Sequence, residues 1–457
     1  MNQLFALESP TPRRTHSLFS ARSLIAMSYA VIAALVIFLV TYALIVSEQV
    51  HRTVIALFGA MLMVLAGVIS QEEAIRHIDF NTLALLIGMM IQVFVLSKTG
   101  LFRFLSVWAA QKTKGSPVLL LIALSVLVAV CSALLDNVTT VLLTVPITFT
   151  LTRDLKISPL PFIMAQIFAS NIGGTCTMIG DPPNIMIASA VKELDFMAFL
   201  TNLTIPCVIS FVITIGILLL IYRKEFKTSS KNRNRIMNIK TQGLIKSAVL
   251  LRRSLFTLGV TIVLFCCHSQ IPGWGLESGT IAVTGASLLM LITMPDRERA
   301  LEQVFARIEW TTIFFFIGLF VLVGGLEVNG IIKWLAERAM DLTHGEMLPT
   351  TMTILVLSSV MSSFVDNIPF VATMIPLVKD MGTMGITNLE PLWWALSLGA
   401  CLGGNGTVIG ASANVVALAI ARKHHLEVSF MGFFKLAFPL MLLSIGISAV
   451  YLWIVFL

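Results

Sequence analysis

Long apolar runs separated by short polar segments make up most of the chain. Eight runs have spanning or near-spanning length, because about 20 helical residues cross the hydrocarbon core of a bilayer. They lie at residues 24–48, 51–69, 80–97, 199–223, 254–270, 278–295, 309–326 and 432–457. The pattern predicts an all-α polytopic membrane protein.

Four further apolar segments are interrupted by polar or glycine-rich residues. Asp-Asn pairs interrupt residues 116–151 and 348–380, and Gly-rich stretches interrupt residues 160–190 and 391–420. Irregular backbone at membrane depth is tolerated only where protein or a water-filled cavity satisfies it. We therefore expect an all-α fold with about ten transmembrane helices plus two re-entrant hairpins and two broken helices.

The two halves of the chain repeat one another. Residues 173–184 (GGTCTMIGDPPN) align without a gap on residues 403–414 (GGNGTVIGASAN), and the same offset places Asp136-Asn137 on Asp366-Asn367. Five crossings and one hairpin per half predict an inverted-topology repeat, an arrangement that places transporter sites near the bilayer midplane. The expected units are an N-terminal tail (1–23), a first repeat (24–223), a basic cytoplasmic linker (224–253) and a second repeat (254–457).

The composition excludes a soluble protein. Hydrophobic residues make up 57 % of the chain and charged residues 12 %, with a mean hydropathy of +0.92. The net charge of +7 does not indicate nucleic-acid binding, because the basic residues lie between apolar segments. The six cysteines form no CxxC motif and predict no disulfide framework. Residues 24–48 are too long for a signal-peptide core, so we expect a retained helix.

The distribution of basic residues predicts the topology. With the N-terminus outside, the segments expected inside carry 23 of the 31 Lys and Arg residues, and the largest group of them lies in the linker. The positive-inside rule then predicts both termini outside and a cytoplasmic linker. If one hairpin crossed fully, a terminus would move inside. Residues 99–113 and 329–345 mix charged with apolar side chains and predict amphipathic helices at the membrane interface.

The two Asp-Asn pairs are the first candidate site residues. An ionisable group inside an apolar segment is costly and points to function. Neither aspartate has a Lys or Arg within a dozen residues. A carboxyl group withdrawn from water without a counter-charge is suited to taking up and releasing protons. The alternative interpretation is that both aspartates only cap the helices that follow.

The Gly-rich breaks supply the second group of candidates. Glycine lets the backbone leave a helix at low steric cost, and exposed amides at the restarting helices suit electron-rich oxygens. A simple packing kink is the alternative. The predicted substrate- and ion-binding residues are Asp136, Asn137, Thr139, Thr140, Asn171, Gly173, Gly174, Thr175, Thr177, Asp181, Asn184, Asp366, Asn367, Asn405, Thr407, Ser412 and Asn414.

One carboxylate occurs in the first half alone. Asp181-Pro182-Pro183 corresponds to Ala411-Ser412-Ala413, so Asp181 has no acidic counterpart. It either binds a coupling ion or caps the helix that restarts at Pro182. Cys176 and Cys401 lie near the two breaks, where buried thiols are more often core residues than ligands. Catalytic triads, P-loops and metal-ligand clusters do not occur in the sequence, so we expect no enzyme, no metal and no cofactor.

These motifs resemble the ion transporter superfamily. Asp136-Asn-Val-Thr-Thr, Ser170-Asn-Ile-Gly-Gly-Thr and Gly180-Asp-Pro-Pro-Asn184, with their echoes in the second half, are most similar to the bacterial arsenite-efflux (ArsB)/NhaD/P-protein permease group. The resemblance implies a scaffold domain, a transport domain, elevator-type movement and often a homodimer. Dicarboxylate and citrate relatives carry Ser-Asn-Thr where this chain has Asp136 and Asp366, so the resemblance favours proton coupling over sodium–carboxylate symport.

The negative charge of Asp136 and Asp366 favours some candidate substrates over others. Two unneutralised aspartates would repel a dianion but not neutral arsenite or antimonite, nor a monovalent cation. We therefore expect arsenite or antimonite efflux driven by protons, with sodium/proton antiport as the alternative and an organic-anion (dicarboxylate or citrate) permease third. An intramembrane aspartyl protease would need a Gly-x-Gly-Asp context that neither aspartate has. A passive channel is disfavoured by the repeat with broken helices.

The remaining expectations concern location and partners. The resemblance to arsenical-resistance antiporters implies a multi-pass protein of the cell inner membrane. Expected partners are the lipid bilayer, a small inorganic substrate, a second copy of the chain and a cytoplasmic ATPase subunit, with no nucleic acid. The expected coupling ion is H⁺, with Na⁺ as the alternative.

Overall fold

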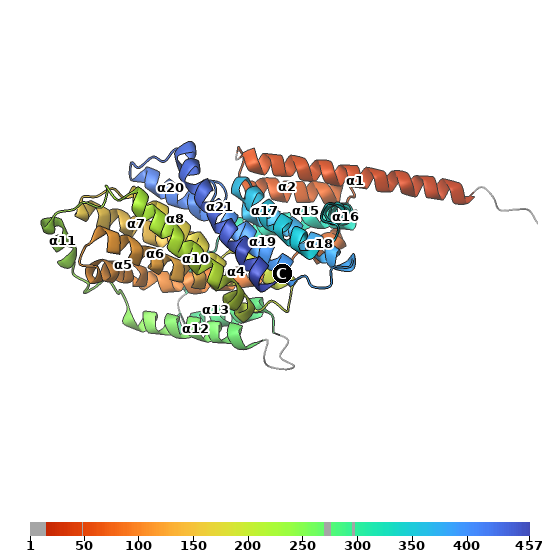
Figure 1. Cartoon of the computed structure of the whole chain (residues 1–457). Coiled ribbons are helices and arrows are strands. Elements are labelled where there is room, and N and C mark those ends of the chain that lie inside the picture. The colour runs from red at the N-terminus through yellow and green to blue at the C-terminus, as the bar shows by residue number, and fades with distance from the viewer. Residues whose placement is uncertain (1–14, 48, 269–275, 295–297) are drawn as a thin grey trace, which may run out of the picture. The chain divides into compact units, whose positions relative to one another are not determined.

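The computed structural model describes residues 15–47, 49–268, 276–294 and 298–457, and residues 15–28 and 298 by their helical backbone alone. Most of the predicted N-terminal tail therefore lies outside the described residues, as do the ends of the runs predicted at 254–270 and 278–295. The described residues form 21 helices and no strand (Figure 1). The all-helical prediction is confirmed.

The helices fall into a first and a second series. The first consists of α1 Thr15–Ser47, α2 Arg52–Leu65, α3 Gln71–His77, α4 Phe80–Lys98, α5 Leu101–Lys112, α6 Pro117–Leu134, α7 Asn137–Leu155, α8 Leu160–Thr175, α9 Pro182–Ala190 and α10 Phe196–Ile221. A short helix, α11 Ser230–Met237, lies in the predicted linker. The second consists of α12 Ala248–Cys267, α13 Ser278–Thr293, α14 Glu298–Phe305, α15 Trp310–Val328, α16 Ile331–Thr343, α17 Met347–Phe364, α18 Asn367–Thr383, α19 Glu390–Gly403, α20 Ser412–Lys423 and α21 Phe430–Val455.

The helix boundaries repeat along with the sequence. Adding 230 to the bounds of α4 and α6 gives those of α15 and α17, and the starts of α7 and α9 become those of α18 and α20. Gly100 and Gly330 precede α5 and α16 with φ of 84° and 74°, a left-handed conformation that favours glycine. The predicted amphipathic segments are thus helices α5 and α16.

Eight described helices are long and apolar enough to cross a membrane. Six coincide with predicted runs, but α2 and α13, from the runs 51–69 and 278–295, have only 14 and 16 residues. The other two are α6 and α17, the first arms of the predicted hairpins. Helix α1 begins at Thr15, ahead of the predicted start at residue 24.

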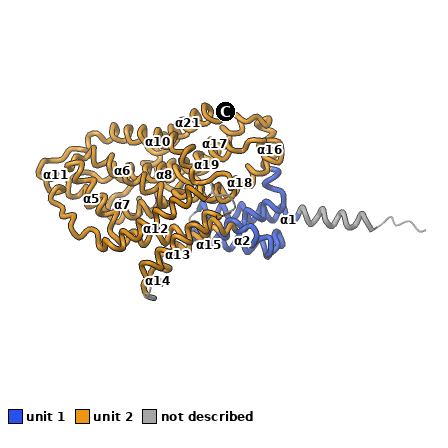
Figure 2. Tube along the Cα trace, turned by 90° about the horizontal axis from the view of Figure 1, so that it is seen from below, with its two compact units in different colours: residues 1–78, 317–334 blue, residues 79–316, 335–457 orange. Residues whose placement is uncertain are grey.

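Two compact units make up the chain, and both repeats contribute to each (Figure 2). Unit 1 consists of residues 1–78 and 317–334; within it α1 packs on α2, and Asn329 donates from Nδ2 to the carbonyl of Val68 at 3.0 Å. Unit 2 consists of residues 79–316 and 335–457. Within unit 2, α6 packs on α8 and α17 packs on α19. All the candidate site residues belong to unit 2.

Glycine permits close helix contacts in unit 2. A Cβ atom on Gly403 would lie 2.6 Å from the carbonyl oxygen of Ser359 and 2.7 Å from its Cα. Gly173, its counterpart in the first half, meets the backbone of Ala129 in the same way, with a Cβ position 2.6 Å from that Cα. Both broken helices are therefore held against a hairpin arm at a distance that no larger residue allows.

Candidate functional site

The two Asp-Asn pairs occupy the sharp turns between α6 and α7 and between α17 and α18. Asp136 is the N-cap of α7, and its Oδ1 accepts from the Thr139 amide at 2.7 Å. Asp366 is the N-cap of α18, and its Oδ1 accepts from the Ile368 amide at 3.2 Å. Both side chains are half-buried. The capping interpretation is therefore correct in geometry for both aspartates.

The Gly-rich segments are the breaks that the sequence predicts. Helix α8 ends at Thr175 and α9 starts at Pro182, whereas α19 ends at Gly403 and α20 starts at Ser412. Asn184, in the first turn of α9, donates from Nδ2 to the carbonyls of Thr175 and Thr177 at 3.0 and 2.9 Å. Asn414, its counterpart in α20, donates to the carbonyls of Gly404 and Thr407 at 2.7 and 2.9 Å. Each restarting helix thus satisfies carbonyl groups that the break leaves open.

Hydroxyl groups tie each break to the neighbouring hairpin arm in the same way in both halves. Ser132 donates to the Ser170 carbonyl at 2.6 Å, and Ser362 donates to the Ala400 carbonyl at 2.6 Å. Thr177 and Thr407 donate to the carbonyls of Ala133 and Ser363. Ser132 and Ser362 were not among the predicted residues. The repeat could have revealed them, since the offset of 230 places Ser132 on Ser362.

Four asparagines from both halves form a cluster that we call the amide half-site: Asn137, Asn171, Asn405 and Asn414. Asn171 donates from Nδ2 to the side-chain oxygens of Asn405 and Asn414 at 3.0 and 2.8 Å. Its own Oδ1 accepts from Asn137 at 3.4 Å. All four residues are at most 3 % exposed. The amide half-site therefore joins the tip of the first hairpin (the turn between α6 and α7) to both broken helices, and it carries no net charge.

A second cluster, the acidic half-site, consists of Asp181, Asp366, Asn367 and Cys401. Asn367 donates from Nδ2 to Asp181 Oδ1 at 3.4 Å, across the boundary between the repeats. Cys401 and Asp366 lie near the same carboxylate. Asp181 is 1 % exposed, and its Oδ2 accepts no hydrogen bond within the described part of the chain. Asp366 Oδ2 also accepts from Ser412 Oγ at 3.4 Å.

Asp181 does not cap the helix that follows it. It occupies the N-cap position of α9, but its side chain makes no capping hydrogen bond. The capping alternative for this residue is therefore wrong. A carboxylate that is removed from water and does not satisfy a helix end is available to a ligand.

Helix α19 also bonds to Asn184 of α9. Ser397 Oγ and Cys401 Sγ donate to Asn184 Oδ1 at 2.6 and 3.4 Å. Ser397 was not predicted, and the repeat carries no signal for it because its counterpart is Ile167. Thr175 donates to the Asn171 carbonyl at 2.7 Å, and the buried Thr140 hydroxyl has no partner among the described residues. Predicted polar residues from both tips and both breaks thus gather in the two half-sites, whereas Thr177 bonds to a hairpin arm and lines an apolar groove. That any of them binds a substrate stays a prediction.

The electrostatics of the region come from carboxylates and helix N-termini. Among the described residues, no Lys, Arg or His forms an ion pair with Asp136 or Asp181. The N-termini of α7, α9, α18 and α20 all carry residues of the two half-sites. Their free amides and dipoles favour electron-rich oxygen atoms. No group of three or more His, Cys, Asp or Glu side chains in the part of the chain that the structure describes is arranged to hold a metal ion.

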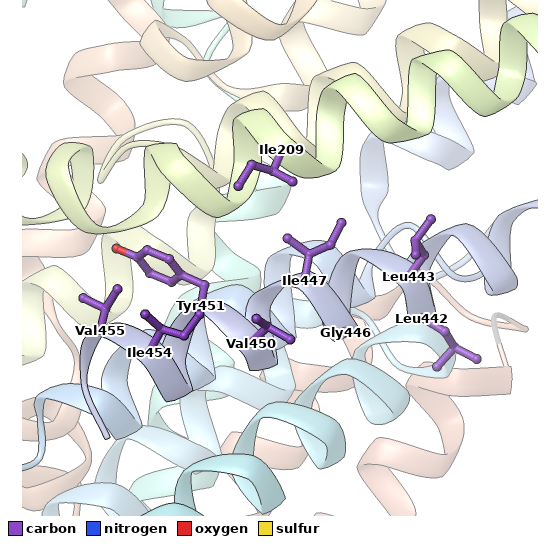
Figure 3. Close-up of a pocket in the computed structure, with 9 residues that line it drawn as sticks. All are labelled: Ile209, Leu442, Leu443, Gly446, Ile447, Val450, Tyr451, Ile454 and Val455. Atoms are coloured by element: carbon purple, nitrogen blue, oxygen red, sulfur yellow. The ribbon is translucent and has the colours of Figure 1, made fainter.

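Two grooves in unit 2 are apolar. One, of about 570 Å³, lies where α10 meets α21, with Ile209 facing a row of α21 side chains (Figure 3). Its other lining residues are Leu442, Leu443, Gly446, Ile447, Val450, Tyr451, Ile454 and Val455. The second, of about 510 Å³, lies among α6, α8, α10 and α12, and its lining includes Gly173, Cys176 and Thr177. Neither offers the polar partners that a small hydrophilic solute requires.

Comparison with known proteins gives a family and a set of relatives. The profile of the CitMHS family, described as citrate transporter, matches residues 42–399. A 46 kDa membrane protein of Mycobacterium leprae is 38 % identical, over 93 % of this chain and 99 % of that protein. An uncharacterized transporter of Mycobacterium tuberculosis is also 38 % identical, over 93 % and 98 %. The human P protein is 34 % identical, over 90 % of this chain and 58 % of the P protein.

Two solved structures share the fold. The YdaH transporter of Alcanivorax borkumensis has a TM-score of 0.55 and 14 % identity, over 93 % of this chain and 98 % of that one. MtrF of Neisseria gonorrhoeae, described with a class of antimetabolite efflux pumps, has a TM-score of 0.56 and 13 % identity, over 86 % and 84 %.

Proposed function

Because the chain belongs to the CitMHS family of the ion transporter superfamily, we propose that it is a proton-coupled secondary transporter that exports small uncharged hydroxides such as arsenite and antimonite. Family membership makes the chain a multi-pass membrane protein and a secondary transporter, not an enzyme. The substrate, the coupling ion and the direction are the proposed parts.

The chemistry of the amide half-site carries the proposal. Its four buried asparagines offer both donors and acceptors without a net charge. A neutral trihydroxide presents the same mixture of donors and acceptors, so it can exchange hydrogen bonds with these amides at little cost. Neighbouring helix N-termini favour its oxygens further.

The proposed mechanism uses alternating access. We assign the substrate- and ion-binding role to the residues predicted from the sequence, with the two halves as an inverted-topology repeat in the inner membrane. The tips and the broken helices, which hydrogen-bond to one another, are expected to move together as a transport domain. Elevator-type movement of that domain, in a homodimer, would carry the solute across. Irregular backbone would remain satisfied throughout, because the breaks bond to the hairpin arms that move with them.

A second candidate is an organic-anion permease, which the description of the family as citrate transporters favours. The described side chains around the half-sites argue against a free polyanion, since they include Asp136, Asp181 and Asp366. Like charges repel strongly in a site withheld from water. Sodium/proton antiport, in which carboxylates exchange the two cations, is the third possibility.

Transport by the purified protein in proteoliposomes separates these candidates. Arsenite, sodium and citrate are each offered under an imposed proton gradient, with protein-free liposomes as the control. The proposal predicts gradient-driven movement of arsenite and coupled proton flux. Sodium flux coupled to protons would establish the antiporter instead, and citrate flux without arsenite flux would establish the organic-anion permease.

A further inference from the structure

The two halves share hydrogen bonds between each break and its hairpin arm, but they differ in the partner of the tip asparagine. Asn171 and Cys401 correspond by the offset of 230, as do Asp181 and Ala411. In the first half the tip residue Asn137 donates to Asn171. In the second half the equivalent partner is a thiol, and the tip residue Asn367 donates to Asp181 of the first half instead. The two sequence differences therefore have a combined effect on Asn367: Cys401 replaces its amide partner, and Asp181 supplies a carboxylate acceptor.

The carboxylate supplied in this way is incompletely satisfied. Asp181 is buried, its Oδ1 receives one long hydrogen bond, and its Oδ2 receives none within the described residues. Asp366 brings a second negative charge close to it. Burying a charged carboxylate without a counter-charge is costly, and a neighbouring like charge adds to the cost. Binding a cation would remove both costs.

We propose that the two half-sites have specialised: the acidic half-site binds the coupling proton on Asp181, and the amide half-site binds the solute. This inference rests on the proposed transport function and specifies it. Protonation forms an O–H bond at Asp181 Oδ2, and the proton leaves to the aqueous side that the transport domain then faces. Asn367 and Cys401 are positioning residues, because they contact the carboxylate and take up no proton.

The groups that lie close to Asp181 come from α7, the start of α18 and α19. Asn137 belongs to α7, Asp366 and Asn367 belong to the start of α18, and Cys401 belongs to α19. Helix α4 also packs on α9, and its one charged residue is Lys98, at the end opposite Asn81, which bonds to Ser189 of α9. Asp366 is therefore the charged group among these helices that lies close to Asp181.

Infrared difference spectroscopy of the purified protein tests the proton site without any substrate. Lowering the pH should produce the carbonyl band of a protonated buried carboxyl, and Asp181→Asn should abolish that band. Asp380→Asn, on α18 outside the half-sites, is the matched control and should retain it. A band that persists in Asp181→Asn, or that disappears in Asp136→Asn, would overturn the proposal.

A double variant tests the division of labour and guards against misfolding of the single variant. Asp181→Ala with Cys401→Asn makes the acidic half-site a copy of the amide one, since Asn367 can then donate to the introduced amide. In proteoliposomes, exchange of labelled arsenite without a gradient should persist, whereas gradient-driven accumulation should fall to the level seen without a gradient. Retained accumulation would contradict the specialisation.

The two experiments distinguish failure of the proposed function from failure of the proposed specialisation. If the wild-type protein moves no arsenite, the proposed function is wrong in its substrate, and the infrared result still decides whether Asp181 holds a proton. If arsenite moves and the Asp181→Asn band persists, the function stands and the specialisation is wrong.

Discussion

At the residue scale, the three membrane-depth carboxylates that the sequence singles out play different parts. Asp136 and Asp366 accept backbone amides as N-caps, whereas Asp181 occupies a cap position without capping. The sequence predicted that polar groups would gather at the tips and breaks, because each needs partners in lipid. It could not predict which oxygen stays unpartnered, because that depends on the direction of side chains from both halves.

Asp136 should be replaceable by asparagine but not by alanine. An asparagine side chain can accept the Thr139 amide, so Asp136→Asn should keep the stability of the wild type. Asp136→Ala removes the cap and should cost about 1 kcal/mol. Chemical unfolding in mixed micelles measures the difference. Equal loss in both variants would show that the charge, rather than the cap, is what the fold requires.

Asn171 should be the least replaceable amide of the site. Asn171→Ala leaves three buried asparagine side chains without their partner, and each unsatisfied group costs about 1–3 kcal/mol. We expect a lowered melting temperature and loss of arsenite exchange. Asn202→Ala, at a half-buried position of α10, is the control and should change neither. Full exchange by Asn171→Ala would remove the amide half-site from the mechanism.

At the element scale, the helix boundaries followed from sequence wherever a break had a chemical cause. The Asp-Asn tips start α7 and α18 one residue after each aspartate, and Pro182 starts α9. Boundaries set by packing were less predictable. The run 51–69 gave the 14-residue α2 because hydropathy continues past Leu65 while the helix ends there.

The contact between α17 and α19 should depend on Gly403. A methyl group on this residue would lie 2.6 Å from the Ser359 carbonyl oxygen, so Gly403→Ala must push the two helices apart. Overpacking of this kind costs about 1–3 kcal/mol. Gly446→Ala in α21 is the matched control, because nothing lies within 4 Å of its Cβ position. The control should be neutral or stabilising, and heating followed by fluorescence-detected size exclusion compares the two. Equal stability of both variants would show that the α17–α19 contact can relax.

At the scale of the whole molecule, the repeat explains why many residues of the candidate site could be predicted from the sequence. Both halves build the same break and the same tip, so an unusual residue in one half can be judged against its counterpart in the other. Comparison of the halves also identifies Ser132 and Ser362, which hold each broken helix against its hairpin arm. Contacts between the halves, such as that of Asn367 with Asp181, have no such signal, because residues 186 positions apart are related only by the fold.

The membrane orientation is the remaining prediction at this scale. The predicted linker contains α11, whose Asn234 is exposed, and it carries the largest group of basic residues. Basic segments resist translocation, so a cysteine placed at Asn234 should not react with an impermeant maleimide added to whole cells. With the N-terminus outside, residues 70–79 between the second and third apolar runs are also expected outside, so a cysteine placed at Glu72, exposed on α3, should react. Both variants are made in a background with the six native cysteines replaced, and permeabilised cells give the reference for full labelling. Labelling of residue 234 from outside, with residue 72 protected, would invert the predicted topology.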